Sequence, residues 1–286
     1  METLCYTLAD LPISIEVPFA MEISPESKPF LQRSGKDPVE RIQLIPVDAL
    51  PPASECGIWH QDRYYVTTDR ENTVYIRSMP GKPPYAMLDY GKPGCIPIFY
   101  LRNTKDMVRE SRYLINMLGL ESLLLRHNCA ILHASFIRWQ GKGILFSAPS
   151  GTGKSTQASL WEEYLGAKIL NGDRAGIRYV NGEWTAYGLP YAGSSHIFHN
   201  ESARICAIVI LRKGPENRIW LMTRMEALQN LLPELSAHIW SPAFMNQVLD
   251  IAGGLLRKIP VYCLECRPDY GAVQLLHDTL MKEEIL

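Results

Sequence analysis

One short run of glycines, hydroxyl residues and a lysine is the part of this sequence best suited to chemistry. Residues 147–156 read SAPSGTGKST. An apolar run, 143–146, comes before it, and a segment with helical spacing, 157–165, follows it and stops at Gly166. A strand, a glycine-rich loop and a helix in that order form the context that a phosphate-binding loop needs.

Each residue type in this run has a part to play in holding phosphate. Gly151 and Gly153 let the backbone curl so that successive N–H groups point at an anion, and the positive end of the next helix faces the same anion. Lys154 supplies an ammonium for the β- and γ-phosphates, and the Ser155 hydroxyl is a hard oxygen ligand for Mg²⁺. The usual first glycine is replaced by Ala148, which is also small. We predict a site for a nucleoside triphosphate, with the binding residues Ser150, Gly151, Thr152, Gly153, Lys154, Ser155 and Thr156.

Two further side chains are candidates for work on the phosphate. Asp173 follows a predicted strand, 167–170, and an acid at that place suits a Mg²⁺ ligand or a base for a hydroxyl, although a turn aspartate beside Gly172 is the plainer interpretation. His133 lies in an alternating segment, 130–139. If the turn that follows is centred near Gly141, regular pairing puts His133 opposite Pro149, at the mouth of the loop. Strand histidines are more often structural, so both interpretations stay open.

Composition excludes several classes of protein. The 286 residues are 47% apolar, carry a formal net charge of −1 and contain no block of lysine and arginine. That balance argues against a broad nucleic-acid footprint and against a membrane surface held by charge. The longest apolar run, 205–211, is too short to span a bilayer, and the first residues show no signal-peptide pattern. Seven cysteines without a framework spacing fit a reducing compartment, so we expect a cytoplasmic protein.

The first part of the chain, residues 1–125, is predicted to be a β-rich region. Alternation or β-branched and aromatic residues indicate strands at 13–17, 85–88 and 95–100, with a hairpin whose loop is 69–72. We expect an antiparallel sheet, with 13–17 at an edge, followed by a helix that begins near Thr104. No catalytic constellation is visible, so the region is expected to be structural or to present a substrate.

The second part, residues 126–286, is predicted to be the nucleotide-binding core. Asn181-Gly182 indicates a tight hairpin after Asp173, where Ras-like and nucleoside-kinase-like proteins would continue with a crossover helix. The small-residue loop 188–196 is either a cover for the site or a plain connector. Helices are predicted at 224–232, 242–256 and 268–281, and a strand is predicted at 260–266.

The sequence leaves the roles of several polar residues open. Asn200, Glu201 and Arg204 could assist at a triphosphate site, but as isolated residues they are more typical of a surface. Cys263 and Cys266 form a lone C-x-x-C on a predicted strand, which puts the two thiols on opposite faces and gives no metal site.

These motifs together carry a resemblance to a known family. LHAS at 132–135, SGTGKST at 150–156 and NGDR at 171–174 resemble the HPr kinase and phosphoenolpyruvate-carboxykinase superfamily. More closely, they are similar to HPr-kinase-like serine kinases found with peptide-modifying gene clusters. The resemblance covers roughly residues 128–215 and a familiar end at 260–280. It implies an α/β fold, with a P-loop core on a mixed, largely antiparallel sheet, and it implies that His133 lies beside the transferred phosphate.

The sequence departs from that family at the acidic position. HPr kinases have two adjacent aspartates there, whereas this chain has Gly172-Asp173. Either the single carboxylate covers one role, or another residue such as His133 or Glu201 helps. HPr itself is therefore not the expected substrate.

The residues and the resemblance together predict an enzyme. We expect an ATP- and Mg²⁺-dependent kinase that phosphorylates a hydroxyl, most simply a serine of a peptide or protein, with Lys154, Asp173 and His133 as catalytic residues and Ser155 and Asp173 at the metal. A kinase for a small metabolite and a nucleotide-binding sensor with little turnover are the alternatives. The acceptor, the nucleotide base and the formation of a homo-oligomer stay open.

Overall fold

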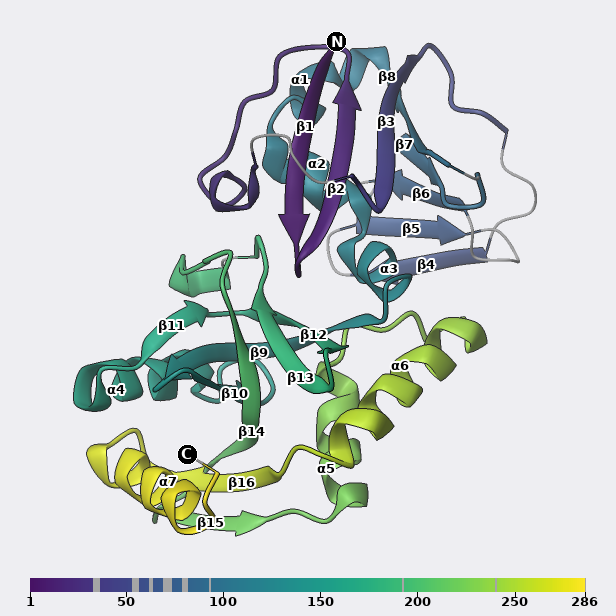
Figure 1. Ribbon diagram of the computed structural model, residues 1–286. Coiled ribbons are helices and arrows are strands. Elements are labelled where there is room, and N and C mark those ends of the chain that lie inside the picture. Colours follow the sequence, from purple (N-terminus) through teal and green to yellow (C-terminus); the bar gives the residue numbers. More distant parts are fainter. Residues whose placement is uncertain are drawn as a thin grey trace. The chain divides into compact units, whose positions relative to one another are not determined.

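The computed structural model describes most of the chain and divides it into two compact units. The residues described are 1–32, 37–52, 57–61, 64–68, 74–78, 82–92, 94–191, 193–239 and 241–285. Contacts within the chain separate unit 1, Met1–Leu120, from unit 2, Glu121–Leu286. Figure 1 shows both units.

Unit 1 is built on one eight-stranded sheet of mixed direction. Along the sheet the order is β1-β2-β3-β8-β7-β6-β5-β4. The strands are β1 (Glu2–Leu8), β2 (Leu11–Val17), β3 (Glu40–Val47), β4 (Gly57–Gln61), β5 (Tyr64–Thr68), β6 (Val74–Ser78), β7 (Pro84–Asp89) and β8 (Ile96–Leu101).

The expectation of a purely antiparallel sheet is wrong at two pairings. Strand β3 runs parallel to both β2 and β8. The long connection from β2 to β3 returns the chain to the same end of the sheet, as a parallel pair requires. The segment predicted at 13–17 belongs to β2, which lies inside the sheet, because β1 pairs with it through a turn in which Ala9 and Asp10 have φ of 51° and 60°. The predicted hairpin loop 69–72 falls outside the described residues.

A short helical layer covers unit 1. It consists of α1 (Lys105–Val108) and α2 (Ser111–Leu118), and α2 ends at Gly119 with φ of 62°. The apolar side chains of α2 that are buried are Leu114, Ile115, Met117 and Leu118. Backbone carbonyls near the end of α2 accept hydrogen bonds from Arg77 and Tyr90, which join the helix to the sheet.

Unit 2 contains a second mixed sheet, in the order β10-β9-β12-β13-β14-β16-β15. Strand β14 also pairs with β10, so five strands form a closed ring, and β11 pairs with β9. The strands are β9 (Cys129–Trp139), β10 (Lys142–Ser147), β11 (Lys168–Asn171), β12 (Arg174–Val180), β13 (Glu183–Gly188), β14 (Ser202–Lys213), β15 (Arg218–Leu221) and β16 (Val261–Cys266). The helices are α3 (Leu120–Leu125), α4 (Lys154–Leu165), α5 (Arg224–Leu231), α6 (Pro242–Leu256) and α7 (Tyr270–Lys282).

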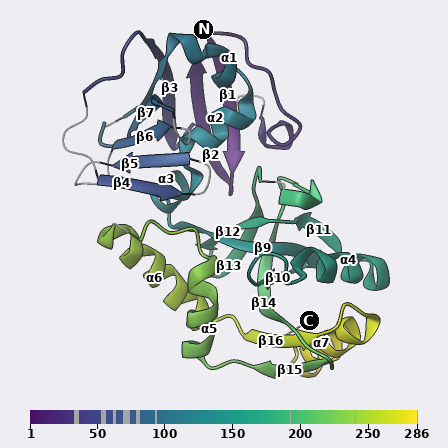
Figure 2. The ribbon, with the colours of Figure 1, turned by 180° about the vertical axis from the view of Figure 1, so that it is seen from behind.

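The alternation of side chains along the strands divides the interior of unit 2 into two apolar clusters. In β14, Ile208 and Ile210 enter the cluster that includes Val248 of α6, whereas Ala207 and Val209 enter the cluster that includes Trp161 of α4. Figures 1 and 2 show the same division, with α4 and α7 on one side of the unit and α5 and α6 on the other.

The sequence patterns in unit 2 predicted the local structure well, with one error of register. The hairpin at Asn181-Gly182 is present, and β12 pairs antiparallel with β13. The turn between β9 and β10 consists of Gln140 and Gly141, both with positive φ, and so Ser147 pairs with Ala134. Continued by one residue, this register puts His133 opposite Ala148, one residue short of the Pro149 expected from a turn centred on Gly141.

No helix in the described parts of the chain is both long enough and apolar enough to cross a membrane.

Candidate functional site

The loop that connects β10 to α4, residues 148–153, is here called the glycine loop. Gly151 and Gly153 have φ of 76° and 118°, which are left-handed values that suit glycine. Gly153 is the N-cap of α4, and its carbonyl accepts a hydrogen bond from Gln157 N at 2.9 Å. The first amides of α4 therefore follow directly on the loop, where a helix has N–H groups without helical partners.

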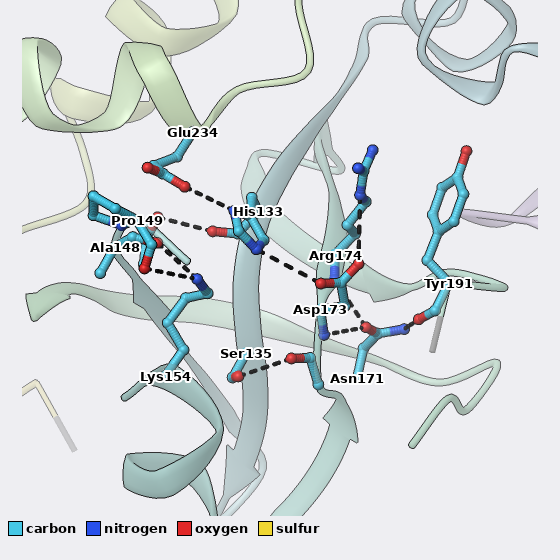
Figure 3. A network of polar contacts seen from close by, with 12 residues as sticks. His133, Ser135, Ala148, Pro149, Lys154, Asn171, Asp173, Arg174, Tyr191 and Glu234 are labelled. Atoms are coloured by element: carbon cyan, nitrogen blue, oxygen red, sulfur yellow. Dashed lines mark hydrogen bonds and ion pairs between the residues drawn. The ribbon is translucent and has the colours of Figure 1, made fainter. Parts of the chain in front are cut away.

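Lys154, in the first turn of α4, folds back over the glycine loop. Its Nζ donates to the carbonyl oxygens of Ala148 at 2.7 Å and Pro149 at 3.4 Å, as Figure 3 shows. Burial lowers the pKa of Lys154, while the negative charges of Glu234 and Asp173 act in the opposite direction. The ammonium is held by neutral carbonyls close to two carboxylates, so a bound anion would meet a cation that is already positioned.

The glycine loop borders a cavity of about 240 Å³, here called the aspartate cavity. Its lining is formed by His133, Ser150, Gly151, Gly153, Lys154, Ser155, Thr156, Gly172 and Asp173. The lining contains every site residue predicted from the sequence except Thr152, and it also contains Gly172. Strand β9, the glycine loop with α4, and the junction of β11 and β12 thus bring together residues that lie forty positions apart along the chain.

Asp173 is positioned by the asparagine at the end of β11. The buried Asn171 accepts hydrogen bonds at its Oδ1 from the backbone N–H groups of Asp173 and Arg174, both at 2.9 Å. Its Nδ2 donates to Leu189 O at 2.7 Å and Tyr191 O at 3.1 Å. A hydrogen bond from Ala134 N to Asp173 O then joins the turn to β9. The carboxylate therefore stands on a backbone that is fixed on both sides, and the loop after β13 helps to fix it.

His133 lies between two carboxylates (Figure 3). Its Nδ1 is 2.8 Å from Glu234 Oε2, and its Nε2 is 3.6 Å from Asp173 Oδ1. A carboxylate only accepts hydrogen bonds, so Nδ1 carries a proton and Nε2 faces Asp173. The backbone holds this arrangement, because His133 O accepts a hydrogen bond from Ser147 Oγ at 3.0 Å.

Comparison with protein families gives one match. A family model described as "SynChlorMet cassette protein ScmC" matches residues 113–272, which is more than half of the chain. The chain belongs to the ScmC family. No curated protein sequence matches it.

Among the solved structures that match this ScmC-family chain, one is an enzyme of low sequence identity. It is the Hpr(Ser) kinase/phosphatase from Coxiella burnetii, with 14% sequence identity over 54% of this chain and 89% of that chain, and with a TM-score of 0.30. A TM-score at that level does not establish a common fold.

The principal residue of the ScmC-family site that sequence reasoning missed is Glu234. It ends the short 3₁₀ helix η4 (Leu232–Glu234), 101 residues after His133. The next residues attach to β9, because Leu235 bridges Leu132 and Ser236 N donates to Ile131 O at 2.8 Å. No motif marks Glu234. Only the pairing of this segment with the strand that carries His133 could have revealed it.

The structure also gives a reason for the glycine at the position where HPr kinases are expected to have an aspartate. A Cβ placed on Gly172 would lie 1.9 Å from Ser195 Oγ and 2.6 Å from Ser195 Cβ. Gly193 lies close to Asp173, with 2.8 Å between a Cβ placed on it and Asp173 Cβ. The described part of the loop 188–196 therefore packs directly against the acidic residue, and the two glycines make room for it.

Two residues considered at the sequence level lie elsewhere in this ScmC-family fold. Glu201 pairs with Arg138 at 2.8 Å and Lys168 at 2.5 Å, and Arg204 pairs with Glu183 at 2.9 Å. Neither Glu201 nor Arg204 lines the aspartate cavity. The second carboxylate near His133 is Glu234 instead of Glu201.

Proposed function

We propose that this chain is an ATP- and Mg²⁺-dependent kinase that transfers the γ-phosphate to a hydroxyl, most simply a serine of a peptide or protein. The observation that carries the proposal is the aspartate cavity, where a glycine loop at a helix start, an ammonium, a carboxylate and an imidazole share one lining. Phosphoryl transfer requires positioning and charge neutralisation more than covalent chemistry, and these groups supply both.

Each step of the transfer is assigned to particular residues of this chain. Amides of the glycine loop and of the first turn of α4 bind the phosphate oxygens, and Lys154 turns from the carbonyls of Ala148 and Pro149 toward the negative charge. The acceptor oxygen forms a bond to the γ-phosphorus while the bond to the β,γ-bridging oxygen breaks and ADP leaves. His133 accepts the hydroxyl proton at Nε2, and Glu234 orients the ring through Nδ1.

The residues present fit a magnesium ion that arrives with the nucleotide. Ser155 and Asp173 line the same cavity and offer a hydroxyl and a carboxylate, which are hard oxygen ligands. Mg²⁺ commonly uses one or two protein ligands and completes its coordination with phosphate oxygens and water. The described residues hold no group of three or more His, Cys, Asp and Glu side chains arranged for a metal, which agrees with an ion held mainly by substrate. Bound Mg²⁺ would neutralise charge on the triphosphate.

The acceptor class rests on two supports outside the geometry. The motifs resemble HPr-kinase-like serine kinases of peptide-modifying gene clusters, and the ScmC family is described as a cassette protein. A gene cassette is the setting in which a kinase for a peptide product would be expected. A small hydroxylated metabolite is the competing acceptor, and the chemistry at the phosphate would be the same.

The test is transfer of label from γ-labelled ATP with Mg²⁺ to serine- and threonine-containing peptides and, separately, to a metabolite extract. Lys154→Ala should reduce transfer at least about a hundredfold, because one charged donor aimed at the transition state is worth about that much. Lys142→Ala is the matched control, since its ammonium lies at the other end of β10 and donates to Ile285 O. Equal transfer by Lys154→Ala and the wild type would contradict the proposal. Label only in the metabolite extract would move the acceptor to a small molecule, and bound nucleotide without transfer would favour a sensor.

A further inference from the structure

The glycine loop borders two further cavities. The first, here called the glutamate cavity, is about 540 Å³ and is lined by Ala148, Pro149, Ser150, Gly151, Thr152, Ile210, Leu211, Arg212, Lys213, Gln229, Asn230, Pro233 and Glu234. The second, here called the glutamine cavity, is about 410 Å³ and is lined by Gly151, Thr152, Gly153, Thr156, Gln157, Leu211, Lys213, Gly214, Cys266, Arg267 and Pro268. Both volumes lie in the range of small-molecule sites.

From these cavities we infer that the nucleoside half of the nucleotide binds in the glutamine cavity, with Gln157 facing the base, which is a 6-aminopurine. The inference rests on the proposed function, because it takes the triphosphate to lie on the glycine loop. It extends that function by assigning a base-binding site and the class of base.

The direction of the bound nucleotide decides between the two cavities. The reacting phosphate must lie at the His133 and Asp173 end of the loop, so the nucleoside must leave at the other end. The glutamate cavity includes Glu234, which contacts His133, and so it adjoins the reacting end. The glutamine cavity contains none of His133, Asp173 and Glu234 and instead includes Gln157, beyond Lys154 in α4.

The charges of the two cavities agree with this direction. Lys213 lies in the lining of both cavities. Each lining also holds a second cation, Arg212 in the glutamate cavity and Arg267 in the glutamine cavity. The linings differ in that the glutamate cavity includes the carboxylate of Glu234, whereas the glutamine cavity has no carboxylate among its described residues. A nucleoside joined to its α-phosphate is a flat ring system with an anion at one end. It suits a cavity with cations and the apolar surfaces of Leu211 and Pro268.

Gln157 provides an independent sign of a missing partner. Its side chain is only 2% exposed, and its Nε2 donates to Cys266 Sγ at 3.4 Å. Its Oε1 is buried and has no hydrogen-bond partner among the described residues. A buried acceptor without a donor is unfavourable, because it has lost its hydrogen bonds to water without replacing them. The exocyclic amine of adenine is a donor of the required kind, and guanine or hypoxanthine presents a carbonyl oxygen at the same position.

The first experiment separates the nucleoside from the phosphates. Calorimetry with Mg²⁺ and no acceptor measures the binding of ATP and of inorganic tripolyphosphate to the full chain. The wild type should bind ATP about tenfold or more tightly than tripolyphosphate, which corresponds to 1.4 kcal/mol or more. Pro268→Trp, at an exposed position of the glutamine cavity, should remove that advantage and leave tripolyphosphate binding unchanged.

Gln229→Trp is the matched control, because it puts the same bulk at an exposed position of the glutamate cavity. It should change neither affinity. Loss of the ATP advantage in Gln229→Trp, with Pro268→Trp unaffected, would put the nucleoside in the glutamate cavity and overturn the inference. Equal binding of ATP and tripolyphosphate by the wild type would also overturn it, while leaving the phosphate site intact. Failure of both ligands to bind would instead refute the proposed function.

A second measurement needs no variant. Cys266 is half-buried in the wall of the glutamine cavity, so a thiol reagent followed by mass spectrometry reports on its access. ATP should slow modification of Cys266 severalfold, inosine triphosphate should protect less, and tripolyphosphate should not protect. Cys95, in unit 1, serves as the internal reference. Equal protection by ATP and tripolyphosphate would overturn the inference.

Discussion

Two charged clusters lie along strand β9, one around Arg138 at its carboxyl end and one around His133 nearer its amino end, and they are built differently. In the Arg138 cluster, Glu201 pairs with two cations at 2.8 and 2.5 Å. In the His133 cluster, Asp173 is 3.6 Å from the imidazole and 3.5 Å from Arg174 Nε, and Lys154 donates only to backbone carbonyls. The first cluster satisfies its own charges and ties strands together. In the second, Glu234 lies 2.8 Å from His133 Nδ1, but among the described residues no ion pair joins Lys154 to Asp173 across the cavity, and this is an arrangement that a charged ligand can complete.

The largest expected loss of activity, which tests this comparison most directly, comes from Asp173→Asn. The amide keeps the size of the side chain but removes the charge that would hold a metal ion. We expect phosphate transfer to fall by about a hundredfold or more, the range for a single group acting on charge in the transition state, with little change in the denaturation midpoint. Single-turnover transfer from labelled ATP is the measurement. Activity within a factor of two of the wild type would show that the His133 cluster is as structural as the Arg138 cluster.

Gly172→Ala should produce the next largest effect, and it acts on stability. The new methyl group would meet Ser195 Oγ and Cβ at 1.9 and 2.6 Å, and the peptide cannot move freely because Gly172 O accepts from the buried Ser135 Oγ at 3.0 Å. Such overpacking costs about 1–3 kcal/mol of unfolding free energy. Denaturant unfolding measures it.

A double variant identifies the cause of that loss. Ser195→Gly removes the side chain that the methyl group would meet, so Gly172→Ala with Ser195→Gly should recover most of the lost stability relative to Ser195→Gly alone. If the two changes add without interaction, the close approach of Ser195 is not the reason for the glycine.

The core of unit 2 was largely predictable because its signals are local. The glycine loop, the hairpin at Asn181-Gly182 and the strand and helices after residue 223 each depend on neighbouring residues, and each is present. The register error at His133 came from one turn residue: Gln140 adopts a positive φ, of 46°, so the turn has two residues. The parallel pairings of β3 in unit 1 depend on which distant strands meet, and no local pattern contains that information.

In the candidate site, too, some residues were predictable from local patterns and others depend on distant pairings. Lys154 and Ser155 follow from a contiguous motif, and Asp173 follows from its place after a strand. Glu234 does not, because its position depends on the segment after η4 pairing with β9. Glu201 was an ambiguous candidate in the sequence, more typical of a surface residue, and the fold shows that it lies with Arg138 and Lys168.

Glu234→Gln tests whether the missed residue acts through His133. The amide oxygen can still accept from Nδ1, so the ring should stay oriented, but the charge that supports a protonated imidazole is gone. We expect kcat to fall about tenfold, with little change in the KM for ATP, because one charge-assisted hydrogen bond is worth about 1.4 kcal/mol more than its neutral counterpart. Steady-state kinetics measure both constants. A role in packing alone would leave kcat unchanged and lower only the stability.

The smallest expected effect belongs to Glu201→Gln, the matched change in the Arg138 cluster. The hydrogen bond from Lys168, with help from Arg138, lowers the pKa of Glu201 below its usual value. A lowered pKa in the folded state means stability that is present above the usual glutamate pKa, about 4.3, and is lost as the pH falls through the folded value. The variant should therefore be about 0.2–1 kcal/mol less stable at neutral pH, and the difference should shrink on acidification. Its kinase activity should equal that of the wild type, and a loss comparable to that of Glu234→Gln would remove the distinction between the two clusters.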